Sequence, residues 1–567
     1  MRSKVPLLLL LLACTCMQAG AYAQPSIVYV DLTATDGANN GNDWDNAYLD
    51  LQDALPSPNT DDEVWVAEGT YRPAGPGGSR TAIFHMDSGT EIYGGFPSGG
   101  STFADRNIEL YETILSGDLN EDDGPIAFQN YGENSYHVVT GNLTDSTAIL
   151  DGFTIIGGNA DATGSPLPAN ATGGGFIVHG TAAGDAGSPA ISNCIFKLNQ
   201  ARIGAGANNY RGSPTFDHCT FWRNKALLYG GGYYNTGGIT GDPPAHGGAV
   251  LQDCRFVANT APAWGGGSCS GNSSPSYINC DFVGNTVTGS GAGAFGGGLS
   301  IGCNQNCSGT PLVVNCTFGG NTALSGNGGG FNNEAGSNVK IHNCVFWENE
   351  DTDGVDESAQ IYVQGGSISV DYTCIDGLVD SGAYDDGTNT GNTPDFVQIS
   401  YARDDSTVFI VPGNTHIVGG SLTNDAGNND EIPSGVDYDR DGFDRTEDDP
   451  DVSDTGNGTS PIVDMGTYEF VGSPYLLTGG VAGTPFSEHA FNRFVDARAE
   501  SSDGVNLDLG IKELTLVFTE QVRDVSASGT EETLSMSSFL VRETGGATPP
   551  TIASVCFDDG QTRASAH

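Results

Sequence analysis

Six copies of one nine-residue pattern dominate the chain, and they constrain its fold more than any other feature. Each copy has an apolar residue, two variable residues, Cys, one variable residue, Phe, two variable residues and Asn. The copies occupy residues 191–199, 216–224, 251–259, 277–285, 313–321 and 341–349. Successive cysteines are 25, 35, 26, 36 and 28 residues apart, and a glycine cluster precedes most copies. Such periods are typical of a solenoid, in which each repeat buries its apolar face only against its neighbours.

The spacing within a copy predicts which way each side chain points. Cys and Phe are two residues apart, so they lie on one face of a strand, and the residues before and after Cys point the other way. The apolar residue three positions before Cys breaks this alternation, so the chain must bend between the two. Asn falls where the strand ends, where its amide can bond to its counterpart in the next repeat. The pattern therefore predicts an all-β chain built as a parallel β-helix with columns of Cys, Phe and Asn.

The repeat cysteines share one position, which favours a buried column of free thiols over disulfides. Of the five other cysteines after residue 23, three concern a second possible arrangement. Cys303 and Cys307 lie in a loop, where they can pair with each other or with Cys269. A zinc site is disfavoured there because the spacing is loose and no histidine is near.

The first residues have the pattern of an export signal. Arg2 and Lys4 precede a short apolar run, and Ala21-Tyr22-Ala23 is a small-residue cleavage site, so residues 1–23 are predicted to be a signal peptide. A lipoprotein-type sequence ending in Cys14 is the alternative, and it predicts a lipid anchor. No later segment is long and apolar enough for a transmembrane helix. We therefore expect a secreted or cell-surface protein.

Removal of residues 1–23 leaves 19 basic and 70 acidic residues, a net charge of −51. Nucleic acid and anionic membranes are disfavoured as partners for such a chain, because both require a basic surface. An acidic surface favours solubility and attracts divalent cations. Glycine accounts for 83 of the 567 residues, about twice its usual share, which fits a chain with many tight turns.

Composition and patterning divide the mature chain into four parts. Residues 24–134 are predicted to form an N-terminal cap and the first rungs, with a capping helix over 45–55 whose N-cap is Asp45. Residues 135–380 carry the repeats, and residues 381–474 are predicted to form C-terminal rungs or a cap, with an Asp-rich loop. Residues 475–567 contain segments in which apolar and polar residues alternate, and these predict an immunoglobulin-like β-sandwich. Few strands can be recognised in the sequence, so the predicted domain can be incomplete.

Two resemblances support this assignment. The Phe-x-x-Asn and Gly-Gly elements resemble the repeats of chlamydial polymorphic outer-membrane proteins, and all six copies match. The sections on either side resemble exported bacterial right-handed parallel β-helix, or pectate-lyase-like, proteins. This second resemblance rests on Trp44, Leu51-Gln52-Asp53-Ala54-Leu55, Val66-Ala67-Glu68-Gly69-Thr70-Tyr71, Gly94-Gly95-Phe96, Arg106-Asn107, Asn424-Asp425-Ala426-Gly427 and Asp464-Met465-Gly466-Thr467-Tyr468-Glu469. It implies the right-handed parallel β-helix fold over roughly residues 27–470 but does not imply a particular function.

The Asp-rich loop has the spacing of an EF-hand-type calcium loop. Oxygen ligands at positions one, three, five, seven and twelve, with glycine at six, correspond to Asp437, Asp439, Asp441, the Phe443 carbonyl and Asp448. Calcium is therefore the expected cofactor, although no flanking helices are evident. Asp118, Asn120 and Asp122 repeat part of this spacing more weakly.

Stacking of the repeats places outward residues of neighbouring rungs beside one another. The middle rungs are predicted to expose His218, Asp253, Arg255 and Asp281 on one sheet face, with the two carboxylates about 8 Å apart. Two carboxylates beside an arginine can bind calcium and a uronate, or act as the acid and base of an inverting glycosidase. The competing interpretation is a solvated sheet face with a weak Asp–Arg pair.

These observations lead to two functional hypotheses. The first is a non-catalytic protein of the cell surface or exterior that binds glycans or neighbouring surfaces through its long flank. The second is a polysaccharide lyase or glycoside hydrolase that acts on an acidic polysaccharide through the middle-rung face. No lyase or hydrolase motif elsewhere in the sequence favours the second.

Overall fold

The computed structural model describes most of the chain between residues 26 and 470. The described ranges are 26–55, 62–124, 127–165, 167–180, 186–237, 248–289, 293–302, 310–334, 336–398, 414–417, 419–450 and 452–470. Residues 1–23, with Cys14, and the loop cysteines Cys303 and Cys307 lie outside them. Of residues 475–567, only the backbone of three antiparallel strands is described, β39 (Leu514–Val517), β41 (Gln561–Ala566) and β40 (Cys556–Asp558). The export, anchoring and immunoglobulin-like assignments therefore stay predictions.

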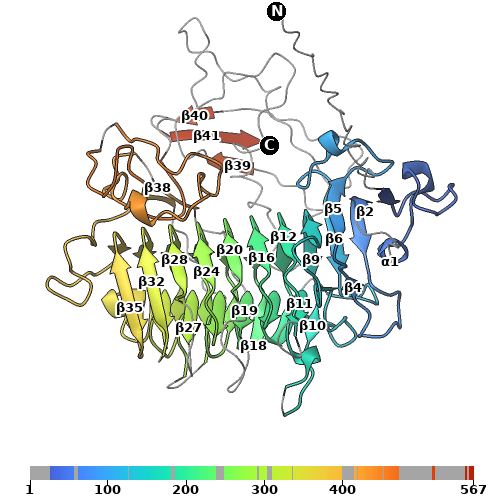
Figure 1. The fold of residues 1–567 in the computed structure, drawn as a ribbon, viewed down its shortest axis with the longest axis horizontal. Helices are drawn as coiled ribbons and strands as arrows, with labels where there is room; N and C mark the ends of the chain where they lie inside the picture. The colour runs from blue at the N-terminus through green and yellow to red at the C-terminus, as the bar shows by residue number, and fades with distance from the viewer. Residues whose placement is uncertain are drawn as a thin grey trace, which may run out of the picture.

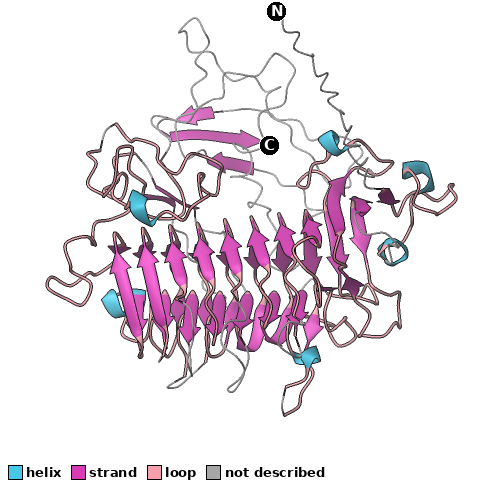
Figure 2. Ribbon diagram, in the orientation of Figure 1, coloured by secondary structure: helices cyan, strands magenta, loops and turns pink. Residues whose placement is uncertain are grey.

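Four long sheets, in which every strand pair is parallel, run side by side along the molecule (Figures 1 and 2). Sheet A contains β1 (Ile27–Val30), β2 (Asp62–Ala67), β5 (Thr90–Phe96), β8 (Ile149–Asp151), β12 (Ala190–Ser192), β16 (Thr215–Asp217), β20 (Val250–Gln252), β24 (Ser276–Ile278), β28 (Leu312–Val314), β32 (Asn338–His342) and β35 (Ser367–Asp371). Sheet B contains β3 (Gly69–Tyr71), β6 (Thr113–Ser116), β9 (Phe153–Ile156), β13 (Ile195–Lys197), β17 (Thr220–Trp222), β21 (Arg255–Val257), β25 (Asp281–Val283), β29 (Thr317–Gly319), β33 (Val345–Trp347) and β36 (Cys374–Ile375).

The other two sheets close the rungs. Sheet C contains β4 (Phe84–His85), β7 (Val139–Thr140), β11 (Phe176–His179), β15 (Ala207–Tyr210), β19 (Tyr233–Thr236), β23 (Ser268–Gly271), β27 (Leu299–Gly302), β31 (Phe331–Asn333) and β34 (Ile361–Val363). Sheet D contains β10 (Asn159–Ala160), β14 (Gln200–Ile203), β18 (Lys225–Tyr229), β22 (Thr260–Ala261), β26 (Thr286–Val287) and β30 (Thr322–Ala323). A full repeat visits the sheets in the order A, B, D and C, so the protein is the predicted parallel β-helix.

Each rung turns at corners where the backbone adopts a left-handed conformation. In the rung that begins with β12, these corners are Asn193 (φ 52°), Leu198 (φ 53°) and Gly204 (φ 61°). Asn193 lies between the buried Ile191 and Cys194, which confirms the predicted bend at this point. The first corner recurs in every copy of the pattern, always at the residue before Cys.

The glycine clusters form the corner between sheets D and C. Gly265, the first glycine of its cluster, has φ +61°, a conformation that residues with a Cβ rarely adopt. A Cβ added to the next glycine, Gly266, would lie 2.5 Å from the carbonyl oxygen of Gly297 in the following rung. The clusters therefore form the tight corners that the sequence predicted, and they also allow close stacking of the rungs.

The interior is built from the predicted columns. The pattern phenylalanines stack ring on ring with centroids 4.4–4.9 Å apart from Phe196 to Phe346. The six pattern cysteines are free and fully buried, and Cys269 and Cys374 are also free and buried. Burial raises the pKa of thiols such as Cys254, Cys280 and Cys316, which keeps them protonated and unreactive. The prediction of a free-thiol column is confirmed.

The pattern asparagines form a continuous hydrogen-bonded ladder. Asn259 donates through Nδ2 to the Phe221 carbonyl (2.7 Å) and to Asn285 Oδ1 (2.9 Å), and its backbone N–H donates to the same Oδ1 (3.0 Å). Asn259 Oδ1 in turn accepts from the backbone and side chain of Asn224. The ladder ends where Gln360, the last residue of α2 (Glu357–Gln360), takes the place of the next asparagine and accepts from Asn349.

The N-terminal end of the solenoid is covered by a shorter helix than the sequence predicts. The helix predicted over residues 45–55 is wrong in length: a 3-10 turn at Trp44–Asn46 is capped by Asp43, not Asp45, and α1 spans only Leu51–Ala54. The chain is extended between them because Tyr48 hydrogen-bonds to the edge of β1 through Tyr29 and Asp31. Leu51 and Ala54 are nevertheless buried in the main core, so α1 does cover this end.

At the opposite end, Leu378 and Tyr384 pack against the same core after β36. The described helices are short throughout; the remaining 3-10 turns are Phe103–Asp105, Ala169–Ala171 and Asn429–Glu431. None of the helices in the described ranges has the length and apolar character needed to cross a bilayer.

We expect Asn259→Ala to lower the free energy of unfolding by about 3 kcal/mol or more, because it leaves buried groups on both neighbouring rungs without partners. Asn392→Ala, at an exposed asparagine outside the ladder, is the control and should change stability by about 0.5 kcal/mol or less. Denaturant unfolding of both variants measures the difference, and equal effects would contradict a stabilising role for the ladder.

Candidate functional site

The predicted site residues come from two different positions of a rung. His218 and Asp253 are corner residues between sheets A and B, with φ values of 51° and 52°. Arg255 and Asp281 begin β21 and β25, and they are paired neighbours in sheet B. The four residues therefore do not share one sheet face, because two of them occupy the turn at its edge.

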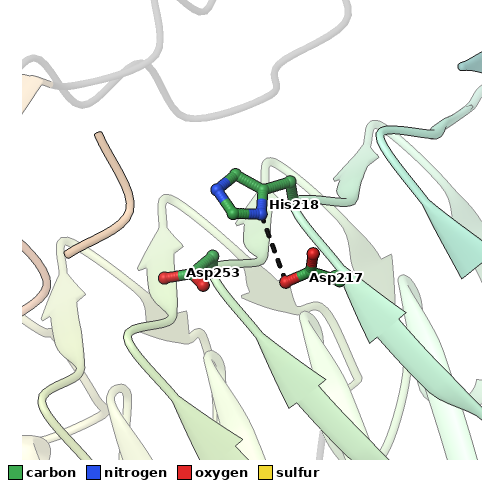
Figure 3. A group of neighbouring side chains, drawn as sticks. All are labelled: Asp217, His218 and Asp253. Carbon is green, nitrogen blue, oxygen red and sulfur yellow. Dashed lines mark ion pairs between the residues drawn. The ribbon is translucent and has the colours of Figure 1, made fainter. Parts of the chain in front are cut away.

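His218 lies beside two carboxylates (Figure 3). Its Nδ1 is 3.2 Å from Asp217 Oδ1, and one ligand atom from each of Asp217, His218 and Asp253 lies within 4.8 Å of the others. The side chains of Asp217 and His218 are 44% and 41% exposed, whereas Asp253 is only 2% exposed. The group is thus a half-open cluster with one buried acid.

The electrostatics of this group follow from that burial. Partial burial alone lowers the pKa of His218, but the hydrogen bond and charge of Asp217, with the charge of Asp253, outweigh it and raise the pKa of His218. Burial raises the pKa of Asp253, which His218 partly offsets. Asp253 is also held by side-chain amides, since its Oδ1 accepts from Asn279 and its Oδ2 from Gln252, both at 2.9 Å.

Asp281 and Arg255 form a buried ion pair. Arg255 Nε donates to Asp281 Oδ2 over 3.2 Å, and Thr415 Oγ1 donates to Asp281 Oδ1 over 2.9 Å. Asp281 is fully buried, and burial raises its pKa against the opposing effect of Arg255. The prediction that Asp253 and Asp281 are exposed is therefore wrong.

Their burial has a specific cause: residues 414–417, 419–450 and 452–470, here named the C-terminal cover, lie over the corner between sheets A and B. Figure 1 shows this segment in orange above the arrowheads of β28 and β32. Arg440 Nε donates to the Asp253 carbonyl (3.1 Å), and Thr467 Oγ1 donates to the Cys280 carbonyl (2.9 Å). Further along, Asn428 exchanges two hydrogen bonds with Asn343.

The first strand of the cover, β38 (Asn414–Ile417), pairs antiparallel with β37 (Phe396–Gln398), which precedes the cover. His416, in β38, stacks on Tyr468 with ring centroids 3.8 Å apart, and its Nε2 lies 2.7 Å from Asp441 Oδ2. Asp253 and Asp281 therefore lie beneath the cover rather than in solvent, whereas Asp217 and His218 stay partly exposed.

The Asp-rich loop is organised by hydrogen bonds to its own backbone. Asp439 Oδ1 accepts from the backbone N–H groups of Asp441 and Phe443, both at 2.9 Å, and Asp439 Oδ2 accepts from that of Glu469. The Phe443 carbonyl accepts from the Asp439 N–H at 2.7 Å. These oxygens, predicted to be calcium ligands, close a tight turn through hydrogen bonds.

Asp448 is separated from the rest of the predicted ligand set. Among the described residues, the groups that bring three or more His, Cys, Asp or Glu ligand atoms together include neither Asp437, Asp439 nor Asp441. Asp448 instead lies with Asp425 and Asp454. Within the described residues, the predicted carboxylate ligands therefore do not form one group, and calcium binding by this loop stays a prediction.

The weaker acidic motif is partly assembled. Asp118 and Asp122 lie with Asp123 and Glu133, while the Asn120 side chain accepts from the Gly77 N–H. Burial raises the pKa of Asp123 to about 7, and the neighbouring carboxylates contribute to this shift. The carboxylates of Asp118 and Asp122 are thus together, as the spacing indicated, without Asn120.

The structure also reveals a feature that the sequence analysis missed: a row of aromatic residues along the corner between sheets D and C. Tyr229, Trp264 and Phe295 pair in consecutive rungs, and Tyr229 stacks on Trp264 with centroids 4.7 Å apart. Tyr234 flanks Tyr229, and Tyr362 stacks on Phe295. All but Phe295 are partly exposed. The signal was an aromatic residue directly before three successive glycine clusters.

Comparison with known proteins adds little beyond the fold. No protein-family model matches the chain, and no curated protein matches it. Among solved structures, pectate lyase Pel9A is 14% identical with a TM-score of 0.39, over 79% of this chain and 97% of that one. A rhamnogalacturonan lyase is 13% identical with a TM-score of 0.35, over 66% and 91% of the two chains. The tailspike protein gp49 of Acinetobacter baumannii bacteriophage Fri1, a capsular polysaccharide depolymerase, is 16% identical with a TM-score of 0.30, over 56% and 53%.

The raised pKa of His218 predicts a pH-dependent contribution to stability. That contribution is fully present below the unfolded pKa of about 6.5 and is lost as pH rises through the folded value. We therefore expect His218→Asn to lower the melting temperature more at pH 5.5 than at pH 9. Asn is the residue at this corner in other rungs, so the substitution fits the left-handed backbone.

Asp217→Asn provides the control for this experiment, because it removes the main partner of the protonated imidazole. The difference between the effects of His218→Asn at the two pH values should shrink in that background. An equal effect of His218→Asn at both pH values in the otherwise native chain would contradict the assignment.

Proposed function

We propose that this chain is an exported, non-catalytic β-helix protein that binds polysaccharide along its flank. The observation that carries the proposal is the partly exposed aromatic row at the corner between sheets D and C. Tyr229 and Trp264 repeat at the spacing of the rungs, which is about 4.8 Å. Two partly exposed contacts at the rung spacing, with Phe295 buried in the next rung, suit a ligand that is itself a chain of repeating units.

The chemistry of the row fits sugars. Tyr229 and Trp264 stack face to face, so their exposed ring edges offer apolar carbon for the C–H groups of a sugar ring, and Tyr supplies a polar hydroxyl. Tyr210 extends the aromatic surface on sheet C, where it stacks on His179 with centroids 4.9 Å apart and lies under the Arg211 guanidinium. Aromatic and guanidinium groups together are the residues most enriched at binding hot spots.

The burial of the candidate acids supports a non-catalytic role. A general acid or base must reach the substrate within hydrogen-bond distance. Asp281 is fully buried, with its oxygens taken by Arg255 and Thr415, and Asp253 is held by Asn279 and Gln252. A substrate would have to displace the C-terminal cover to reach either one.

Charge decides between classes of polysaccharide. With a formal net charge of −49 for the whole sequence, the protein repels polyanions at low ionic strength. A neutral glycan is therefore the favoured ligand. An acidic polysaccharide would need divalent cations to bridge the two negative surfaces.

We expect Trp264→Ala to weaken retention of the bound polysaccharide at least about tenfold, or about 1.4 kcal/mol, because it removes the largest ring of the row. Affinity electrophoresis through gels containing neutral and acidic polysaccharides measures this. Trp222→Ala is the matched control, since Trp222 is also partly buried but lies in sheet B. Loss of binding with Trp222→Ala alone would place the site elsewhere and overturn the proposal.

A polysaccharide lyase or hydrolase remains the second candidate, and the observation that favours it is the partly exposed His218 between Asp217 and Asp253. A histidine with a raised pKa beside carboxylates is suited to proton transfer. On the main proposal, we expect purified protein with calcium to release no product from a uronate polymer.

If cleavage is detected, the enzymatic candidate predicts that His218→Asn lowers the rate at least about 100-fold. Binding to the same polymer should then persist, because the variant leaves the aromatic row unchanged. Cleavage that meets both conditions would replace the non-catalytic proposal.

A further inference from the structure

Three carboxylates converge at the surface of the C-terminal cover. One oxygen from each of Asp425, Asp448 and Asp454 lies within 4.8 Å of the other two. Asp448 and Asp454 are exposed, whereas Asp425 is fully buried beneath them. Asp448 and Asp454 are six residues apart, whereas Asp425 lies in a turn 23 residues before Asp448, so the fold brings two segments of the cover together.

Asp425 is held with one oxygen unsatisfied. Its Oδ2 accepts from the Asp449 backbone N–H at 3.1 Å, but its Oδ1 is buried and has no hydrogen-bond partner among the described residues. Its backbone is fixed on both sides, because its N–H donates to Asp464 Oδ1 (2.7 Å) and its carbonyl accepts from Thr455 (2.9 Å). A buried carboxylate oxygen without a donor is unfavourable unless something else compensates it.

The charge of this cluster is not compensated by a basic residue in the described part of the chain. Within those ranges, no Lys, Arg or His forms an ion pair with Asp425, Asp448 or Asp454. The buried Arg445 pairs with Glu469 instead, at 3.1 Å.

We propose that Asp425, Asp448 and Asp454 bind a calcium ion that fastens the C-terminal cover. Three carboxylates give hard oxygen ligands, and the exposed side of the cluster leaves room for the waters that complete six to eight positions. The group consists of aspartates alone, and this donor set argues against zinc. The ion would join the turn at Asp425 to the segment that contains Asp448 and Asp454.

This position connects the ion to the solenoid. Two residues after Asp425, Gly427 pairs with Val463, and Asn428 then exchanges hydrogen bonds with Asn343 at the corner of sheets A and B. Fixing Asp425 therefore fixes the segment that rests on the rungs. The ion would stabilise the cover that buries Asp253 and Asp281.

The test uses the full chain, stripped with chelator and then titrated with calcium chloride. We expect a rise in melting temperature of about 2 °C or more and binding measurable by isothermal titration calorimetry. Asp425→Asn and Asp454→Asn should each remove one calcium ion from the measured stoichiometry. Asp454 is exposed, so its variant tests the proposal even if Asp425→Asn fails to fold.

Asp437→Asn is the matched control, since Asp437 is an exposed aspartate of the neighbouring loop outside the cluster. It should leave the stoichiometry unchanged, and in chelator Asp425→Asn should be at least as stable as the native chain because it removes repulsion. Three results would each overturn the proposal. They are an unchanged calcium stoichiometry in Asp454→Asn, the loss of a calcium ion in Asp437→Asn, and a rise in melting temperature with magnesium equal to that with calcium.

Discussion

The whole architecture depends on stacking identical side chains directly over one another. The asparagine ladder is the clearest case, because each amide satisfies backbone groups at a corner that the sheets leave unpaired. A displaced rung would leave buried N–H and carbonyl groups on both neighbours without partners. The phenylalanine stack and the thiol column then occupy the interior that this ladder aligns.

Much of the solenoid is readable from the sequence because its interactions are local and repeated. Cys254 and Phe256 point inward as their spacing requires, and the bend before Cys254 lies at Asp253. The same corner explains why His218 and Asp253 attract attention as candidates for chemistry. Asn, Asp and His are the residues most enriched at positive φ after glycine, so the backbone alone accounts for their presence in this column.

The candidate site was less predictable, because the burial of its residues depends on segments of the chain that do not repeat. Thr467 contacts Cys280 across 187 residues, and no periodicity relates these two parts of the chain. Burial of Asp281 by Thr415 has the same origin. The Asp-rich loop shows a related limit, since Asp439 matches a ligand spacing but its oxygens accept backbone N–H groups instead.

Termination of the ladder at Gln360 has a consequence for how such proteins change length. The glutamine from α2 supplies the oxygen that a further asparagine would supply, so the last repeat is closed by one side chain. Each repeat interacts only with its neighbours. Whole repeats can thus be gained or lost before Gln360 while the closing contact is kept. The length of the solenoid can therefore change in evolution by one rung at a time.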